Sequence, residues 1–422
     1  MSEFLAPIDY RRAWDVLRKL SQYNEYSKER AADVLSLLKE SYPLVFQKTE
    51  TKSFDNHALL MEMPGASISD PLVFVSHLDA HSVSAAMQTS NSLRAALEHA
   101  HVVTLLEALE ALLSEGYRPS GDLLIALSMD GLSGSHGAKS MAKHLLARKI
   151  SPCFVLDFGG YVTRSTFCTY LPKNAPLALI GISEKGLLQC RVSADKTDLK
   201  GRFAGNPLVP ILRSGGRLSI FPRCPSLCKS SEQMLLELSK TAPFLQRLLV
   251  IKPRLTFPLL TFLWRKRAIM QQFFLSERIL THVHSRGKSS CPPESASYSF
   301  RQMTLPGKNL SLWKKRLTRR IGHRGLHCET QIELEHSTRS SASGESWDAL
   351  QTAVEILFDR VRVAPCLSPY VTDGRFYGAL KGNVYRFSPF LLTAEESLQG
   401  ECTLTDDSLQ TAVQFFRQML SV

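Results

Sequence analysis

The sequence lacks the signatures of a secreted, disulfide-stabilised or membrane-spanning protein. Its nine cysteines form no C-x-x-C pair and no regular framework, which predicts reduced thiols and a cytoplasmic location. The first fourteen residues carry Asp9, Arg11 and Arg12 and contain no apolar core, so they do not resemble a signal peptide. The most apolar stretch, 242–264, is interrupted by Arg247, Lys252, Pro253, Arg254 and Pro258, which excludes a simple transmembrane helix.

The composition is that of a globular protein with an excess of positive charge. Of the 422 residues, 44% are hydrophobic and 21% are charged, and the formal net charge is +12. The cations concentrate at 265–267 and at 314–324, and the second group falls in an amphipathic helix predicted over 310–321. No nucleic-acid recognition motif accompanies this charge, so we expect a solvated helix face. Binding of an anionic polymer through that helix is a third-ranked alternative, and nucleic acid is not expected as a partner.

Helical and strand patterns alternate along the first part of the chain. Helical spacing of apolar residues appears at 10–20, 31–38, 101–115 and 137–148, and strand patterns appear at 53–63, 72–76, 122–128 and 153–156. Such alternation predicts the α/β class, with a mostly parallel sheet and helices on both of its faces.

The strand predicted over 72–76 leads directly into His77 and Asp79. In open α/β sheets, ligands bind at the carboxyl ends of the strands. A carboxylate two residues after a histidine can accept the second ring N–H and fix the tautomer that a metal-binding imidazole needs. The alternative is a structural polar cluster at a strand end, and these two residues alone do not separate the possibilities.

Several short motifs follow one another in an order that points to a known enzyme family. They are the helix 10–20, the segments 72–79 and 123–127, the turn 133–138, the segments 155–157 and 182–186, and far downstream 371–375 and 385–389. Together they resemble the dizinc aminoacylase and carboxypeptidase family, nearest its carboxypeptidase-S and N-acyl-amino-acid hydrolase branch. The resemblance covers 1–190 and 345–422 well and 190–340 only loosely.

The resemblance implies a catalytic α/β domain interrupted by a smaller α+β lid. The expected boundaries are 1–188 for the first part of the catalytic domain, 189–342 for the lid and 343–422 for the second part. It also implies two zinc ions bridged by an aspartate and a water, which a glutamate deprotonates for attack on an amide carbonyl beside a free carboxylate. Lids pair in many members of the family, so a homodimer through the lid is expected.

Only part of the family's metal site can be transferred to this sequence. By resemblance, His77 is the first histidine ligand, Asp79 is its hydrogen-bonding partner, and Asp157 is the terminal carboxylate ligand of the same zinc. Where the family has Glu-Glu, this chain has Asp130-Gly131. Asp130 is then either the general base or only the residue that precedes the pair, and the carboxylate of the second zinc is missing.

Other family residues are replaced at their matching positions. The bridging aspartate aligns with Leu97 or Glu98, and His99 falls near the lysine that follows, which makes His99 a further candidate ligand. The last histidine ligand aligns with Gln399, whose amide is a poor zinc ligand. The lid's substrate-contacting histidine is absent from 193–198. We therefore expect fewer than two zinc ions per chain.

Arg375 keeps its family motif, Thr-Asp-x-Arg, together with Asp373. By resemblance this arginine holds the free carboxylate of the substrate, a task that suits the planar guanidinium; the alternative is an arginine paired with Asp373 or with a helix C-terminus. These features predict a catalytically impaired hydrolase relative that binds a small carboxylate or peptide ligand. The main alternative is an active metallohydrolase with a rearranged, mononuclear site that draws on His81, His99, His101 or His136.

Overall fold

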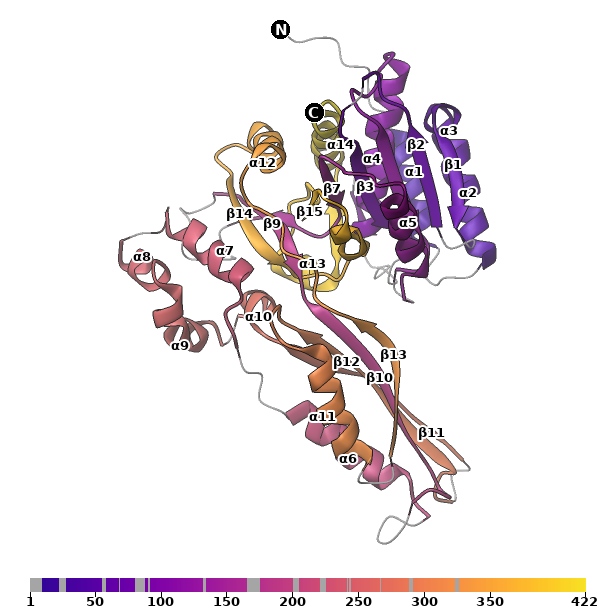
Figure 1. The fold of residues 1–422 in the computed structure, drawn as a ribbon, viewed down its shortest axis with the longest axis vertical. Helices are drawn as coiled ribbons and strands as arrows, with labels where there is room; N and C mark the ends of the chain where they lie inside the picture. The colour runs from indigo at the N-terminus through magenta and orange to yellow at the C-terminus, as the bar shows by residue number, and fades with distance from the viewer. Residues whose placement is uncertain are drawn as a thin grey trace. The chain divides into compact units, whose positions relative to one another are not determined.

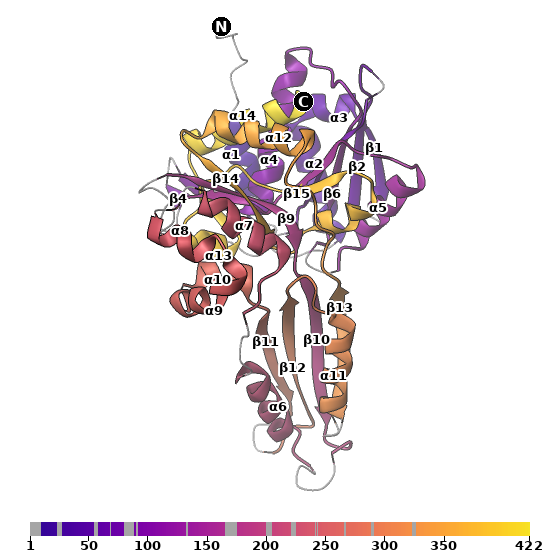
Figure 2. The same cartoon turned by 60° about the vertical axis from the view of Figure 1, so that its left-hand side comes forward.

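The structure is a computed structural model, and it describes residues 10–22, 28–54, 58–67, 69–79, 88–89, 92–131, 134–164, 175–199, 205–220, 225–240, 242, 244–265, 267–287, 291–322 and 326–422. The chain forms two compact units (Figures 1 and 2). The first contains Met1–Ser183, Glu232–Thr256 and Thr338–Val422, and the second contains Glu184–Ser231 and Phe257–Ser337. This division assigns 232–256 to the first unit, whereas the sequence predicts that 232–256 belongs to the lid.

The first unit is built on a nine-stranded mixed sheet in the order β1-β2-β6-β3-β7-β15-β9-β14, with β8 paired to β9. The neighbours β6, β3, β7 and β15 pair in parallel, whereas the β1–β2, β2–β6 and β15–β9 pairs are antiparallel. The predicted parallel sheet is therefore confirmed at its centre. The strands are β1 (Glu50–Phe54), β2 (Ala58–Met63), β3 (Leu72–His77), β6 (Leu123–Ser128), β7 (Phe154–Asp157), β8 (Tyr161–Thr163), β9 (Leu177–Glu184), β14 (Arg362–Ser368) and β15 (Asn383–Arg386).

Helices cover both faces of this sheet, as the sequence predicts. Successive side chains of a strand point to opposite faces. On β3, Val73 and Val75 belong to a core cluster that includes Met141 of α5 (His136–Ala147). Phe74, between them, makes an edge contact with Phe416 of α14 (Asp406–Leu420), with ring centroids 6.2 Å apart.

The first unit also contains a three-stranded sheet and further helices. The small sheet has the order β16-β5-β4. Its strands are β4 (Gln88–Thr89), β5 (Ser92–Ala96) and β16 (Glu401–Leu404). The further helices are α1 (Tyr10–Leu20), α2 (Lys28–Ser41), α3 (Pro43–Lys48), α4 (Leu97–Ser114), α8 (Phe244–Val250), α12 (Glu345–Leu357), the 3-10 helix η2 (Asp373–Ala379) and α13 (Ala394–Gln399). Helices α7 (Lys229–Ser239) and α9 (Pro253–Trp264) each cross the division between the units.

The second unit has an antiparallel sheet in the order β11-β12-β10-β13. Its strands are β10 (Gly186–Asp195), β11 (Glu277–Arg286), β12 (Ser295–Thr304) and β13 (His327–Leu334), and its helices are α6 (Leu208–Ile220), α10 (Ala268–Phe274) and α11 (Leu310–Gly322). The basic helix α11 turns Leu310, Leu317 and Ile321 into the core of this unit, and its Lys314 pairs with Glu333. The exposed cations of α11 therefore lie opposite a packed apolar face.

Two local differences from the sequence prediction matter for the site. Helix α4 begins at Leu97, four residues before the predicted start, so Glu98 and His99 lie in its first turn. The stretch predicted as one strand over 53–63 belongs to two strands, β1 and β2, which pair antiparallel with Phe54 opposite Ala58. A pattern of apolar residues marks both strands without showing where the chain reverses.

Candidate functional site

Polar side chains gather where three parallel strands of the first unit end. His77, Ser128 and Asp157 are the last residues of β3, β6 and β7. His77 lies opposite Ser128 in the strand register. Asp373, the first residue of η2, accepts a hydrogen bond from the Ser128 hydroxyl. The carboxyl edge of the sheet is thus the candidate site, where the sequence predicts it.

His77 is held between carboxylates. Its Nδ1 donates to the Asp79 carbonyl oxygen at 2.8 Å and lies 3.2 Å from Asp79 Oδ1, while its Nε2 lies 4.0 Å from Glu98 Oε1. Burial alone would lower the pKa of His77, but the hydrogen bond to Asp79 and the charges of Asp79, Glu98 and Asp373 outweigh it and raise this pKa to about 10. Asp79 is thus the hydrogen-bonding partner of His77 that the sequence predicts, and the shortest contact of Nδ1 is with its backbone carbonyl oxygen.

Glu98 is a site residue that the sequence identified only as one of two alternatives. Leu97 is completely buried, whereas the Glu98 carboxylate reaches the Nε2 side of His77. Burial raises the pKa of Glu98, and the charge of His77 opposes that rise. Of the two aligned residues, only Glu98 therefore brings a carboxylate beside His77. The signal in the sequence was the family alignment, which gave Leu97 or Glu98 at this position.

Gly131 lies against the His77 ring. Its backbone N–H donates to Asp79 Oδ1 at 2.8 Å. A Cβ added at this glycine would lie 2.5 Å from His77 Cγ and 2.7 Å from His77 Cδ2, closer than real Cβ contacts. The position that aligns with the second-zinc carboxylate therefore has no room for a side chain while His77 keeps its place.

Asp130 holds the start of helix α5. Its Oδ2 accepts from the His136 backbone N–H at 2.7 Å, and its Oδ1 accepts from the Gly137 N–H at 3.2 Å. Ser135, at the N-cap of this helix, makes no side-chain cap hydrogen bond. Asp130 therefore stabilises the helix N-terminus in its place. This geometry favours a structural role for Asp130 over the predicted role of general base.

Asp157 and the segment 373–375 form one connected group. Asp157 is fully buried, and its two oxygens accept from the backbone N–H groups of Phe158 at 2.8 Å and Gly374 at 2.5 Å. Burial raises the pKa of Asp373. Arg375 follows in the same 3-10 helix, is 9% exposed, and donates from Nε to the Thr372 carbonyl oxygen at 3.3 Å. The predicted carboxylate anchor and the predicted zinc ligand are thus joined through one short segment.

The histidines of α4 are neutral side chains with local partners. His99 Nε2 donates to the Leu78 carbonyl oxygen at 2.8 Å, and burial lowers its pKa to about 4, so only Nδ1 remains for a metal. His101 Nδ1 lies 3.1 Å from Ser388 Oγ, and burial lowers its pKa to about 3. His136 is the first residue of α5, and His81 lies outside the described residues.

Gln399, which by resemblance aligns with the family's last histidine ligand, is engaged elsewhere. It ends α13, and Gly400 follows in the left-handed conformation with φ 72°. The Gln399 Oε1 accepts a hydrogen bond from Arg94, and its Nε2 lies 3.5 Å from Glu395 Oε1. Both the oxygen and the nitrogen of the Gln399 amide therefore have partners.

The side chains that the structure describes are not grouped as a pair of zinc ions would require. Within the described part of the chain, no three His, Cys, Asp or Glu side chains are grouped so that they could hold a metal ion. A catalytic zinc needs about three protein ligands. His77 and Glu98 approach one another, but Asp157 accepts from backbone N–H groups, and two positions that by resemblance would supply ligands are occupied by Gly131 and Gln399.

Comparisons with known proteins agree with the fold and the motifs. The model of peptidase family M20/M25/M40 matches residues 94–421. The human N-fatty-acyl-amino acid synthase/hydrolase PM20D1 is 26% identical over 306 residues, which cover 70% of this chain and 59% of that protein. The probable carboxypeptidase S-like 2 of Dictyostelium discoideum is 24% identical over 299 residues, which cover 69% of this chain and 56% of that protein. The chain thus matches less than two thirds of the length of either relative.

Two solved structures share the fold over nearly the whole chain. The M20 family metallo-carboxypeptidase Sso-CP2 from Sulfolobus solfataricus has a TM-score of 0.68 and 12% identity, with 97% of this chain and 98% of that chain covered. The di-peptidase Dug1p from Saccharomyces cerevisiae has a TM-score of 0.70 and 11% identity, with 97% and 95% covered. The family resemblance predicted from the motifs is therefore confirmed, and this chain belongs to peptidase family M20/M25/M40.

Proposed function

We propose that this chain is an M20 relative with impaired dizinc hydrolysis whose site binds a small carboxylate or peptide ligand. The observation that carries the proposal is Gly131, where a Cβ would lie 2.5 Å from His77 Cγ. The chain cannot place a carboxylate there without displacing the one histidine that matches a family ligand. Gln399, tied to Arg94, supports the same conclusion at the last ligand position.

Ligand binding makes smaller demands than hydrolysis. Hydrolysis in this family needs the metals, a bridging carboxylate and a base together, whereas capture of a carboxylate needs an anchor. Arg375 keeps its motif and is positioned by Thr372. A charge-assisted hydrogen bond contributes about 1.5–3 kcal/mol, which is enough for weak binding of a small anion.

Calorimetry with a panel of N-acyl amino acids and dipeptides tests the proposal. We expect weak binding, lowered about tenfold or more by Arg375→Ala, and hydrolysis that is absent or slower by about two orders of magnitude or more. Arg360→Ala is the matched control, because the Arg360 side chain is 88% exposed at the surface. Equal binding by the Arg375 variant, or no binding by the wild type, would count against a retained ligand site.

A second candidate function is a hydrolase with a rearranged mononuclear site. The distance of 4.0 Å between His77 Nε2 and Glu98 Oε1 favours it, because these two side chains could share one ion. A bound zinc would lower the pKa of a water and polarise a carbonyl. One zinc per chain by elemental analysis, lost together with hydrolysis in Glu98→Gln, would favour this candidate over the first.

We also propose a homodimer through the second unit and a cytoplasmic location. The edge strand β11 supports the dimer, since its Ile279 and Val283 are 48% and 50% exposed. Cys153, Cys190, Cys228, Cys328 and Cys402 carry free thiols, which supports a reducing compartment. A monomeric mass by light scattering at micromolar concentration would contradict the dimer, and cell fractionation tests the location.

A further inference from the structure

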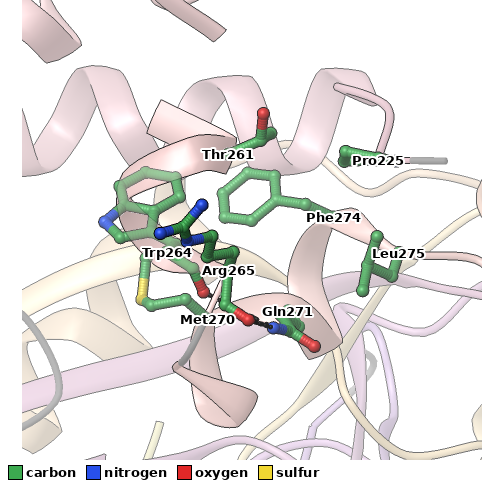
Figure 3. A pocket seen from close by; sticks show the side chains of 8 residues that line it. All are labelled: Pro225, Thr261, Trp264, Arg265, Met270, Gln271, Phe274 and Leu275. Atoms are coloured by element: carbon green, nitrogen blue, oxygen red, sulfur yellow. Dashed lines mark hydrogen bonds between the residues drawn. The ribbon is translucent and has the colours of Figure 1, made fainter. Parts of the chain in front are cut away.

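Helix α9 packs through one side. On that side Leu260 is fully buried and Trp264 is 7% exposed. The Trp264 ring stacks on Phe274 of α10, with centroids 5.2 Å apart and planes 21° apart. Figure 3 shows these two rings in a pocket of about 330 Å³ that is also lined by Thr261, Arg265, Met270, Gln271, Pro225 and Leu275. The side of α9 that carries Leu260 and Trp264 is therefore the side that packs against the protein.

The opposite side of α9 is apolar and exposed. Leu255, Leu259, Phe262 and Leu263 are 77%, 49%, 57% and 49% exposed. Their spacing of i, i+4, i+7 and i+8 places all four on one face of the helix, which we call the α9 apolar face. Soluble proteins seldom expose contiguous apolar surface of this kind, and where they do it marks an interaction site.

The sequence around this face is cationic and contains no acidic residue. Between positions 240 and 276 there is no Asp or Glu, while the cations are Lys240, Arg247, Lys252, Arg254, Arg265, Lys266 and Arg267. Two of these cations pair with glutamates of α7, Lys240 with Glu237 and Arg254 with Glu232. The Arg265 guanidinium lies over the Phe262 ring, 4.2 Å from its centroid, so a positive charge adjoins the α9 apolar face directly. Among the described residues Arg265 has no carboxylate partner.

We propose that the α9 apolar face binds the surface of an anionic lipid bilayer. The apolar side chains would enter the boundary between headgroups and acyl chains, and Arg265 and Arg267 would contact lipid phosphates. With 12 residues α9 is too short to span a bilayer, which needs about 20. None of the helices in the described part of the chain could span a membrane.

The charge distribution favours a membrane over a second copy of the chain. A two-fold dimer contact brings the same patch of both copies together. The cations beside one α9 apolar face would then meet their own counterparts, and like charges across an interface are unfavourable. An anionic bilayer instead pairs those cations with phosphates while it covers the leucines and Phe262.

Flotation of the full chain with lipid vesicles tests this proposal. We expect binding to vesicles that contain phosphatidylserine, much weaker binding to vesicles of phosphatidylcholine alone, and a loss of binding as salt is raised. The combined variant Leu255→Ser, Leu259→Ser and Phe262→Ser should bind at least about tenfold more weakly, because it removes the inserted apolar surface. All three side chains are largely exposed, so the variant should fold as the wild type does.

Two further variants separate the apolar and the electrostatic contributions. The control variant Leu146→Ser, Ile356→Ser and Leu398→Ser replaces side chains that are 47%, 65% and 51% exposed, and it should bind as the wild type does. The variant Arg265→Gln, Arg267→Gln should lose about tenfold or more of its binding to phosphatidylserine vesicles, since each cation near an anionic surface contributes about fivefold.

Three results would overturn the proposal. They are no binding to phosphatidylserine vesicles, equal binding by the Leu255, Leu259 and Phe262 variant, and concentration-dependent self-association that this variant abolishes. The last result would show that a second copy covers the α9 apolar face.

Discussion

Replacing Gly131 with alanine tests the packing of the candidate site directly. The added Cβ would lie 2.5 Å from Cγ, 2.7 Å from Cδ2 and 2.9 Å from Cβ of His77. Ordinary contact begins near 3.4 Å, so the His77 ring would have to move by about 3.4 − 2.5 = 0.9 Å. His77 is 2% exposed and is held through Nδ1 by Asp79, so such a movement breaks an existing hydrogen bond.

The expected cost follows from these two effects. Overpacking of a buried site costs about 1–3 kcal/mol. Weakening the charge-assisted contact between His77 and Asp79 adds about 1.5–3 kcal/mol at most. Part of the overpacking strain is relieved when the contact between His77 and Asp79 breaks, so the two costs do not add fully. We therefore expect Gly131→Ala to lower the free energy of unfolding by about 2–4 kcal/mol.

Urea unfolding followed by circular dichroism measures this change, and hydrogen exchange of β3 gives a local readout of the same site. Gly215→Ala is the control. Gly215 lies in helix α6, and a Cβ there would come no closer than 3.7 Å to Tyr298. Alanine should stabilise that helix by about 0.5–1 kcal/mol.

The reasoning is refuted if Gly131→Ala is as stable as the wild type. That result would mean that His77 leaves space for a side chain at position 131. A carboxylate of the family type could then be accommodated there, and the argument for an impaired dizinc site would lose its main support.

Three other changes probe the site. Asp130→Ala should cost about 1–2 kcal/mol of unfolding free energy, because it removes the acceptor of the His136 and Gly137 amides; no change in urea unfolding would contradict the capping role. Chelation with EDTA should leave the midpoint temperature of unfolding unchanged, and elemental analysis should give fewer than two zinc ions per chain. A lower midpoint after chelation would show a tightly held metal. Burial lowers the pKa of His101 to about 3. Between pH 6.5 and 5 this histidine therefore binds a proton in the unfolded chain but not in the folded chain, so the free energy of unfolding decreases as the pH is lowered. His101→Met should abolish about 2 kcal/mol of that fall, as measured by unfolding at pH 7 and pH 5.

The sequence determined features that depend on neighbouring residues. Apolar spacing over 10–20 predicted α1 with the bounds that the structure has. The apolar run before His77 predicted β3 and the position of His77 at its end. Motifs in a fixed order predicted the family. Each of these depends on periodicity or local identity, which a linear sequence displays.

Only the tertiary structure decided which atoms of the site meet. The choice between Leu97 and Glu98 depended on α4 bringing one of them beside His77, 21 positions earlier in the chain. The lack of space at Gly131 arises from the His77 ring, which belongs to β3, 54 positions earlier in the chain. The Asp157 oxygen meets the Gly374 amide across 217 positions. Such contacts are set by how strands and helices pack, and local spacing carries no information about them.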